Sequence, residues 1–219
     1  MRILSTMKNN YICNCEHYDF SNKDFKYWEN RAVTTDEISI VEYIKSINYT
    51  KRLNILHVGV GNSYVYEQLN YKHKLCGITI ANSEITKSNL YNDKNYDVFY
   101  CDKMSKSLQK LFHNKKFDLI IDSNLKSYSC CNKTFNYMFN NFVNLLELNG
   151  SIITTRVGMN WVKKLKPSIS FNFKEFLHYK LKEYDGDQIN IFTIEEAQRL
   201  SKNYSLELNL GEKIVSFKK

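Results

Sequence analysis

The chain has 219 residues, of which 43% are hydrophobic and 14% aromatic, so it is long and apolar enough for one domain with a sizeable core, and a disordered chain is excluded. The net charge of +8 is compatible with an anionic partner, but the lysines are dispersed, which favours a solvated surface over a nucleic-acid footprint. No run of 18 apolar residues occurs and the N-terminal segment lacks the apolar core of a signal peptide, so we expect a cytoplasmic protein without a membrane span.

The N-terminal part of the chain is predicted to hold one helix. Residues 1–20 have no clear period, and we expect them to form a loosely attached arm. Thr34 and Glu37 have the spacing of a capping box, and the apolar residues that follow recur at helical spacing. The pattern therefore predicts a helix after Thr34 that packs on a sheet.

Strands and helices are predicted to alternate over the rest of the chain. A run of apolar and β-branched residues leads into Gly59 and Gly61, a turn whose free amides can face a polar ligand. Four further apolar segments follow, with helix-like segments between them: residues 74–80, 97–102, 117–122 and 151–157. This alternation is typical of a parallel, doubly wound α/β sheet.

The last elements of the sequence differ from this alternation. A helix capped by Thr193 and Glu196 is expected, and the segments SLELNL and EKIVSFKK then flank Gly211 as a predicted antiparallel hairpin. A further turn is expected at Asn149 and Gly150, because both residue types can enter the left-handed region between a helix and a strand.

By the order of these elements and by its glycine turn, the chain from about residue 38 to the C-terminus resembles the class I S-adenosylmethionine-dependent methyltransferases. The resemblance implies a Rossmann-like sheet of seven strands, mostly parallel, with a C-terminal antiparallel hairpin. It implies S-adenosylmethionine as cofactor and S-adenosylhomocysteine as product. We expect a single domain over 1–219, with an N-terminal arm or lid over 1–34 and a substrate-cap insertion over 158–192.

The glycine turn departs from the family pattern at two positions. His57 stands where the family commonly has an acid that helps hold the methionine amino group, and Ser63 stands at the third glycine after Gly59 and Gly61. Either His57 takes a neutral hydrogen-bonding role or the amino group is bound elsewhere. A histidine at the end of a buried strand is also compatible with a satisfied core residue.

The next two strand ends carry the other cofactor contacts that the resemblance implies. Thr79 and Ile80 end the second strand in a segment similar to that of the cyclopropane-fatty-acid synthases, in which the ribose contact moves to the position of Glu84. Glu84 could instead be a solvated residue in the first turn of a helix. At the third strand end, Asp102 would accept from the adenine amino group and the Lys103 amide would donate to the ring, although Asp102 could also cap the following helix.

The fourth strand end is expected to face the transferred methyl group. Asp122 is our first candidate for a general base there and His178 the second, and Asp122 is also expected near the cofactor. The segment containing Trp28 lies where many family members lay an N-terminal lid over the cofactor, although ordinary packing explains it equally well. The remaining candidates would contact the acceptor: Lys126, Tyr128, Arg156 and Tyr179.

These candidates have alternatives. Arg156 could bind a substrate anion or pair with Asp122. His178 and Tyr179 on a lone helix are also compatible with packing residues.

Several chemistries are disfavoured by missing motifs. The loop after Asp122 is not the proline-containing clamp of amino-methylating DNA enzymes, and no Pro-Cys nucleophile occurs. The fifth strand ends in Thr154, Thr155 and Arg156, without the acids that an octahedral magnesium site needs, so no magnesium is expected.

Six cysteines occur, without a C-x-x-C pair, and reduced thiols are expected. Cys76 and Cys101 fall on predicted buried strands. Cys13 and Cys15 could conceivably gather a metal with Cys130 and Cys131, but these spacings match no common site, so no metal is predicted.

The resulting prediction is metal-independent, in-line methyl transfer to a small polar metabolite or sugar-type acceptor. The alternatives are an RNA methyltransferase that uses the basic surface, and a non-catalytic scaffold protein, motivated by His57 and Ser63 in the glycine turn. Aminopropyl transfer or cofactor cleavage on the same fold also stays open, because a fold does not fix a chemistry.

Overall fold

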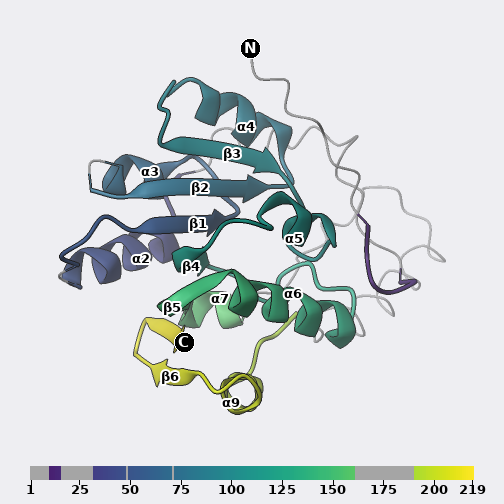
Figure 1. Ribbon diagram of the computed structural model, residues 1–219. Helices are drawn as coiled ribbons and strands as arrows, with labels where there is room; N and C mark the ends of the chain where they lie inside the picture. The colour runs from purple at the N-terminus through teal and green to yellow at the C-terminus, as the bar shows by residue number, and fades with distance from the viewer. Residues whose placement is uncertain (1–9, 16–31, 48, 71, 161–189) are drawn as a thin grey trace, which may run out of the picture.

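A seven-stranded sheet lies at the centre of the computed structural model, which describes residues 10–15, 32–47, 49–70, 72–160 and 190–219 (Figure 1). The strand order is β3-β2-β1-β4-β5-β7-β6. The first five strands in this order form four parallel pairs, whereas β7 is antiparallel to both β5 and β6, which confirms the predicted sheet and hairpin. The strands are β1 Asn54–Val58, β2 Lys74–Thr79, β3 Tyr96–Tyr100, β4 Phe117–Asp122, β5 Leu146–Thr155, β6 Glu207–Leu210 and β7 Ile214–Lys218.

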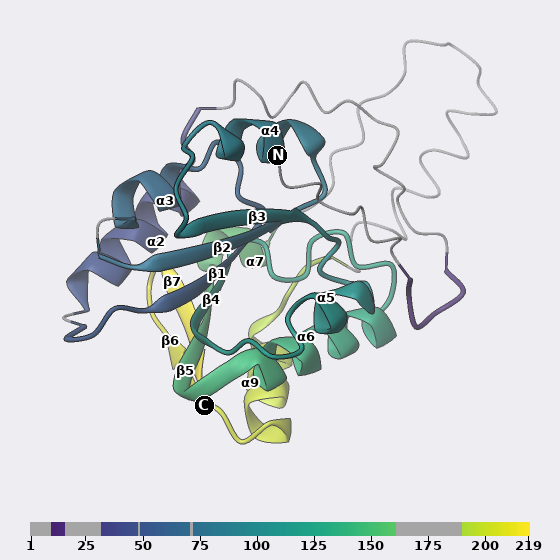
Figure 2. The ribbon, with the colours of Figure 1, turned by 45° about the horizontal axis from the view of Figure 1, so that its top comes forward.

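Helices cover both faces of the sheet, so the described residues form three layers (Figure 2). One face is covered by α2 and α3, with α4 on the same side, and the other by α5, α6 and α9. The described helices are α2 Thr35–Ser46, α3 Tyr64–Leu69, α4 Asn82–Asn89, α5 Ser107–Leu111, α6 Asn132–Leu145, α7 Arg156–Met159 and α9 Ile194–Asn203.

The central strands consist mostly of consecutive apolar residues because both of their faces are buried. In β1, residues 55 to 58 are all buried, and alternate residues enter different cores. Ile55 packs with α2 and α3, whereas Leu56 packs with α5, α6 and α9. A strand covered in this way has no solvent face that would require polar alternation.

Both predicted capping boxes are present. The Thr34 hydroxyl accepts from the Glu37 amide at 3.3 Å, and the Glu37 carboxylate accepts from the Thr34 amide at 2.8 Å. Thr193 and Glu196 do the same at the start of α9. Each box satisfies amides that the first turn of a helix leaves without intrahelical partners.

The turn between α6 and β5 differs from the prediction. Asn149 has a φ of 66°, but Gly150 is not in the left-handed region, and β5 already begins at Leu146. The pairing of β4 with β5 shifts register between Phe117 and Leu119 beside this point. A Cβ on Gly150 would lie only 3.0 Å from the Phe117 carbonyl oxygen, so glycine is needed here for close strand approach rather than for its φ.

The described part of the N-terminal arm is attached more firmly than expected. The carbonyl of Asn10 accepts from the Lys106 amide at 2.6 Å, and Tyr11 packs against the core beneath α5 and α6. Residues 1–9 and 16–31 of the expected arm, and 161–189 of the expected cap, lie outside the described residues. The two flanks of the cap meet where the Phe192 amide donates to the Met159 carbonyl at 2.8 Å. No helix among the described residues has the length and apolar character needed to cross a membrane.

Candidate functional site

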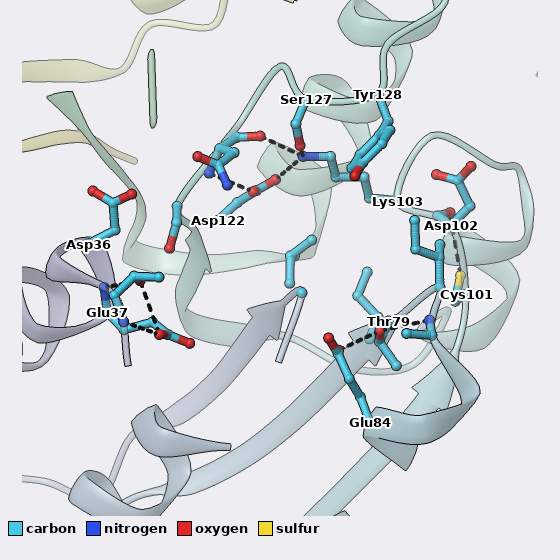
Figure 3. Close-up of a pocket in the computed structure, with 18 residues that line it drawn as sticks. Asp36, Glu37, Thr79, Glu84, Cys101, Asp102, Lys103, Asp122, Ser127 and Tyr128 are labelled. Atoms are coloured by element: carbon cyan, nitrogen blue, oxygen red, sulfur yellow. Dashed lines mark hydrogen bonds and ion pairs between the residues drawn. The ribbon is translucent and has the colours of Figure 1, made fainter. Parts of the chain in front are cut away.

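A cavity of about 270 Å³ opens where the carboxyl ends of β1, β2, β3 and β4 meet the N-terminus of α2 (Figure 3). The strand order reverses between β1 and β4, and open α/β sheets bind ligands outside the strand ends at such a point. The cavity lies near the lower end of the roughly 300–1,000 Å³ range of small-molecule sites. It brings together eight of the residues proposed from the sequence: Gly59, Thr79, Ile80, Glu84, Asp102, Lys103, Asp122 and Tyr128.

The glycine turn presents bare backbone to this cavity. Gly59 has a φ of 70°, lines the cavity and has no atom within 4 Å of the place where a Cβ would stand. A side chain at this position would therefore project into open space that a ligand can use. Gly61 also has a positive φ, of 55°, but it does not line the cavity.

Ser63 and His57 serve the fold around the turn. Ser63 adopts the left-handed conformation expected for a third glycine, with a φ of 67°, and its hydroxyl hydrogen-bonds the Tyr96 hydroxyl at 2.9 Å. His57 is 1% exposed and lies within β1, opposite Gly77 and Ile121. Neither side chain lines the cavity, so the structure does not bring them to the place of a ligand.

The end of β2 holds a buried carboxylate at the cavity wall. The Thr79 hydroxyl donates to the Glu84 carboxylate at 2.6 Å and accepts from the Ala81 amide at 3.0 Å (Figure 3). Glu84 is 3% exposed although it lies in the first turn of α4, so it is not the solvated residue of the alternative reading. Thr79 thus fixes the orientation of Glu84 toward the cavity.

The end of β3 holds the second cavity carboxylate, Asp102. One oxygen accepts from the Met104 amide at 2.8 Å and the other from the Tyr11 hydroxyl at 2.7 Å. Burial, together with the neighbouring Asp102 carboxylate, raises the pKa of Tyr11, which keeps its hydroxyl protonated as a donor. The alternative role of Asp102 as the cap of the next helix is not found, because the N-cap of α5 is Lys106.

The side chain of Lys103, which the sequence suggested only for its backbone amide, forms a buried ion pair. Its ammonium lies 2.7 Å from the Asp122 carboxylate and also donates to Asn124 O, Leu125 O and Ser127 Oγ. The other Asp122 oxygen accepts from the Asn124 amide at 3.2 Å. Lys103 therefore ties the end of β4 to the loop that follows it.

The loop after β4 forms one wall of the cavity. Ser123, Asn124, Ser127 and Tyr128 all line it, and Tyr128 has a φ of 61°, which is uncommon for a bulky residue. The close-up places Tyr128 beside the Lys103 side chain (Figure 3). A strained, half-buried tyrosine at a cavity wall is a feature that recurs at ligand sites.

The start of α2 forms the opposite wall, and sequence reasoning missed it. Thr34, Asp36 and Glu37 line the cavity, and Figure 3 shows both acids across from the Lys103–Asp122 pair. The capping box predicted where α2 begins, but no pattern in the sequence places this helix start beside the ends of β1 and β4. The acidic first turn was the available signal.

Two proposed substrate residues lie elsewhere. Lys126 is 4% exposed and pairs with Glu196 of α9 at 2.6 Å, with its ammonium also over the Phe135 ring. The Arg156 Nε donates to the Gly211 carbonyl at 3.0 Å, and Asp122 pairs with Lys103, so the alternative pairing of Arg156 with Asp122 is not found. The remaining candidates lie outside the described residues: Trp28, His178 and Tyr179.

Solved structures of methyltransferases resemble this fold. The N-methyltransferase NodS from Bradyrhizobium japonicum, in complex with S-adenosylhomocysteine, aligns with a TM-score of 0.56 at 12% identity over 92% of this chain and 94% of its own. An O-methyltransferase family protein from Burkholderia thailandensis gives 0.54 at 6% identity over 84% and 55%. Phosphoethanolamine N-methyltransferase 2 from Haemonchus contortus, in complex with S-adenosylmethionine, gives 0.52 at 17% identity over 79% and 37%.

No protein-family model and no curated protein matches the sequence. The fold and the strand order nevertheless define an α/β protein with a cavity at its topological switch point. The chain has the fold of the class I S-adenosylmethionine-dependent methyltransferases, as the resemblance in the sequence predicted.

Proposed function

We propose that this protein is an S-adenosylmethionine-dependent methyltransferase that acts on a small polar metabolite or sugar-type acceptor without a catalytic metal. The observation that carries the proposal is the succession of Gly59, Glu84 and Asp102 around one cavity, at the ends of three neighbouring strands. This succession suits a nucleoside with an amino-acid tail, since bare backbone, a ribose acceptor and an acceptor for an exocyclic amine follow one another.

Glu84 and Asp102 are acceptors that protein donors hold at the cavity wall. Asp102 accepts from Met104 and Tyr11, and Glu84 accepts from Thr79. A carboxylate has about four lone-pair sites, so one carboxylate can accept from several donors, and we assign adenine to Asp102 and ribose to Glu84. Their partners hold both groups in position before a ligand arrives, which lowers the entropy that binding must remove.

The methionine amino group lacks its usual acidic partner because His57 stands at that position, and His57 is buried within β1 and does not line the cavity. We assign this role to Asp36 and Glu37, the acids that line the cavity at the start of α2. Glu37 is engaged with Thr34 in the capping box, whereas Asp36 is half-buried, so Asp36 is the better position for mutagenesis.

The bound cofactor would supply an electrophilic methyl group, so the protein mainly aligns the acceptor and excludes water. Asp122 stays the first candidate for a base that takes a proton from a hydroxyl or ammonium acceptor, and His178 the second. Lys103 holds the Asp122 carboxylate in place, and Tyr128 on the same loop is the proposed contact for the acceptor.

Titration calorimetry with S-adenosylmethionine and S-adenosylhomocysteine tests the cofactor. We expect micromolar binding that weakens at least tenfold in Asp102→Asn and in Glu84→Gln, and that weakens in Asp36→Asn. Glu207→Gln, an exposed change on β6 away from the cavity, serves as the matched control and should bind as the native chain does. Absence of binding to both ligands would overturn the proposal and favour a scaffold protein with this fold.

Production of S-adenosylhomocysteine in the presence of candidate acceptors tests the reaction. The panel should contain small amines, hydroxy compounds, sugars and a mixed RNA, each assayed at low and high salt. Turnover with a small acceptor supports the proposal. Turnover with RNA alone, falling steeply with salt, would replace the proposed acceptor class.

A further inference from the structure

Four cysteine thiols from two distant parts of the chain meet beside the N-terminus of α6. The sulfur atoms of Cys13, Cys15, Cys130 and Cys131 all lie within 4.8 Å of one another. The Cys13 and Cys130 sulfurs are 3.3 Å apart and those of Cys130 and Cys131 are 3.8 Å apart. Within the part of the chain that the structure describes, this is the one group of three or more histidine, cysteine or acidic side chains whose ligand atoms converge.

These spacings fit four ligands around one ion. Tetrahedral Zn²⁺ has zinc–sulfur bonds of about 2.3 Å, which places the sulfurs roughly 3.8 Å apart. Thiolates that hold a cluster of several irons surround a larger object and lie farther apart than those of a single-ion site. All four cysteines are thiols rather than disulfides, which is the form that can lose a proton and bind a metal ion.

The start of α6 and the Thr134 hydroxyl offer groups that stabilise negative charge at the cluster. Cys131 is the N-cap of α6, a helix of 14 residues, and the helix start offers free amides and the positive end of the helix dipole. The buried hydroxyl of Thr134 lies 2.9 Å from the Cys130 sulfur, 3.0 Å from that of Cys131 and 3.6 Å from that of Cys13. The hydroxyl has one proton, so it can donate to one of these sulfurs at a time and stabilise that sulfur as a thiolate.

We propose that Cys13, Cys15, Cys130 and Cys131 bind one zinc ion in a tetrahedral, all-thiolate site that fastens the N-terminal segment to α6. Four thiols lose their protons to solvent as four zinc–sulfur bonds form, without any change of oxidation state. The ligand set is closed, with no position left for water, so the role is structural. This site replaces the sequence expectation of no metal, which rested on the spacing of the cysteines alone.

The zinc site would act on the cavity through the segment that it holds. Residues 10–15 lie beside α6 (Figure 2). Asn10 and Tyr11 precede Cys13 by only a few residues. Tyr11 donates to Asp102, a cavity residue, and Asn10 accepts from Lys106. Fastening Cys13 and Cys15 therefore keeps Tyr11 against Asp102. The zinc proposal itself does not depend on the proposed function.

Metal analysis of tag-free protein purified under reducing conditions tests the site. We expect one zinc per chain in the native protein and in Cys76→Ala, a control thiol on β2 outside the cluster. Cys130→Ser should lose at least nine tenths of the zinc. Cys15→Ser changes the exposed ligand and so disturbs the fold least, and we expect it to weaken zinc binding at least a hundredfold in competition with a chelator.

Co²⁺ spectra and amide hydrogen exchange test the site independently of the metal analysis. Co²⁺ added to the metal-free chain should give the visible bands of tetrahedral thiolate coordination, and Zn²⁺ should slow amide hydrogen exchange at residues 10–15. Native protein that takes up no zinc, or that carries a Cys13–Cys130 disulfide when purified under reducing conditions, would overturn the site. Stoichiometric iron in place of zinc would overturn the assignment of the ion. Loss of cofactor binding with zinc still bound would overturn only the proposed function.

Discussion

Replacing Lys103 with methionine tests how strongly the buried ion pair holds the candidate active site together. The Lys103 side chain is 8% exposed, and it faces an Asp122 side chain that is 4% exposed. Removing the ammonium leaves the Asp122 charge buried without its partner and deprives Asn124 O, Leu125 O and Ser127 Oγ of a donor. Breaking a buried pair on one side typically costs about 3–5 kcal/mol.

This loss is large enough to measure by urea denaturation followed by circular dichroism. With a slope of about 2 kcal/mol/M, the midpoint of Lys103→Met should fall by roughly 1.5–2.5 M. Lys51→Met is the matched control, because Lys51 pairs with Asp118 of β4 at 2.5 Å but its side chain is 69% exposed. Water screens that pair, so the control should differ little from the native chain.

Asp122→Asn in the Lys103→Met background separates the charge from the packing. If the unpaired carboxylate causes most of the loss, the double variant should recover more than half of it, since no buried charge remains. An equal midpoint shift in Lys103→Met and Lys51→Met would refute the argument. A double variant no more stable than Lys103→Met would show that the carbonyl contacts, and not the ion pair, dominate.

Three other changes test different parts of the structure. Gly158→Ala would place a Cβ 1.7 Å from the backbone oxygen of Ser123, and because no side-chain rotation relieves that clash, thermal and urea unfolding should show a loss of about 3 kcal/mol. Gly59→Ala meets no neighbouring atom, so it should lose only the roughly 1–2 kcal/mol of a left-handed alanine, yet calorimetry should show weaker cofactor binding because its methyl enters the cavity. Burial lowers the pKa of His73 below its ordinary 6.5. As the pH falls, His73 therefore takes up a proton in the unfolded chain at a higher pH than in the folded chain. The free energy of unfolding should then fall as the pH drops below about 6.5. His73→Gln should flatten that fall in urea titrations between pH 7.5 and 5.5.

Local patterns were enough to predict most of the fold. The two capping boxes, the alternation of apolar runs with helices and the hairpin at Gly211 each depend on residues close together in the sequence. The bulge at the start of β5 could not be predicted in the same way. It arises because Gly150 must pass close to the Phe117 carbonyl of a neighbouring strand, and that approach is a property of the assembled sheet.

The candidate site likewise contains residues that could be predicted from the sequence and residues that could not. Residues at strand ends, such as Glu84 and Asp102, could be predicted because parallel strands bring their carboxyl ends to one edge of the sheet. The start of α2, the Lys103 side chain and the contact from Tyr11 could not, because each reaches the cavity through tertiary packing that no spacing in the sequence encodes. The cysteine cluster is the extreme case, since 117 positions separate Cys13 from Cys130.

Three of the cavity carboxylates, Glu84, Asp102 and Asp122, share the feature that protein donors already hold them. Thr79 donates to Glu84, Tyr11 and Met104 donate to Asp102, and Lys103 and Asn124 donate to Asp122. Acceptors fixed in this way need not be ordered when a ligand binds, so the site favours a ligand whose donors match their positions. The contact from Tyr11 differs from the others in depending on the arm, and we therefore expect removal of zinc to weaken binding at Asp102 more than at Glu84. Calorimetry with adenosine, with and without zinc, in the native chain and in Asp102→Asn, should show a zinc effect that the variant largely loses.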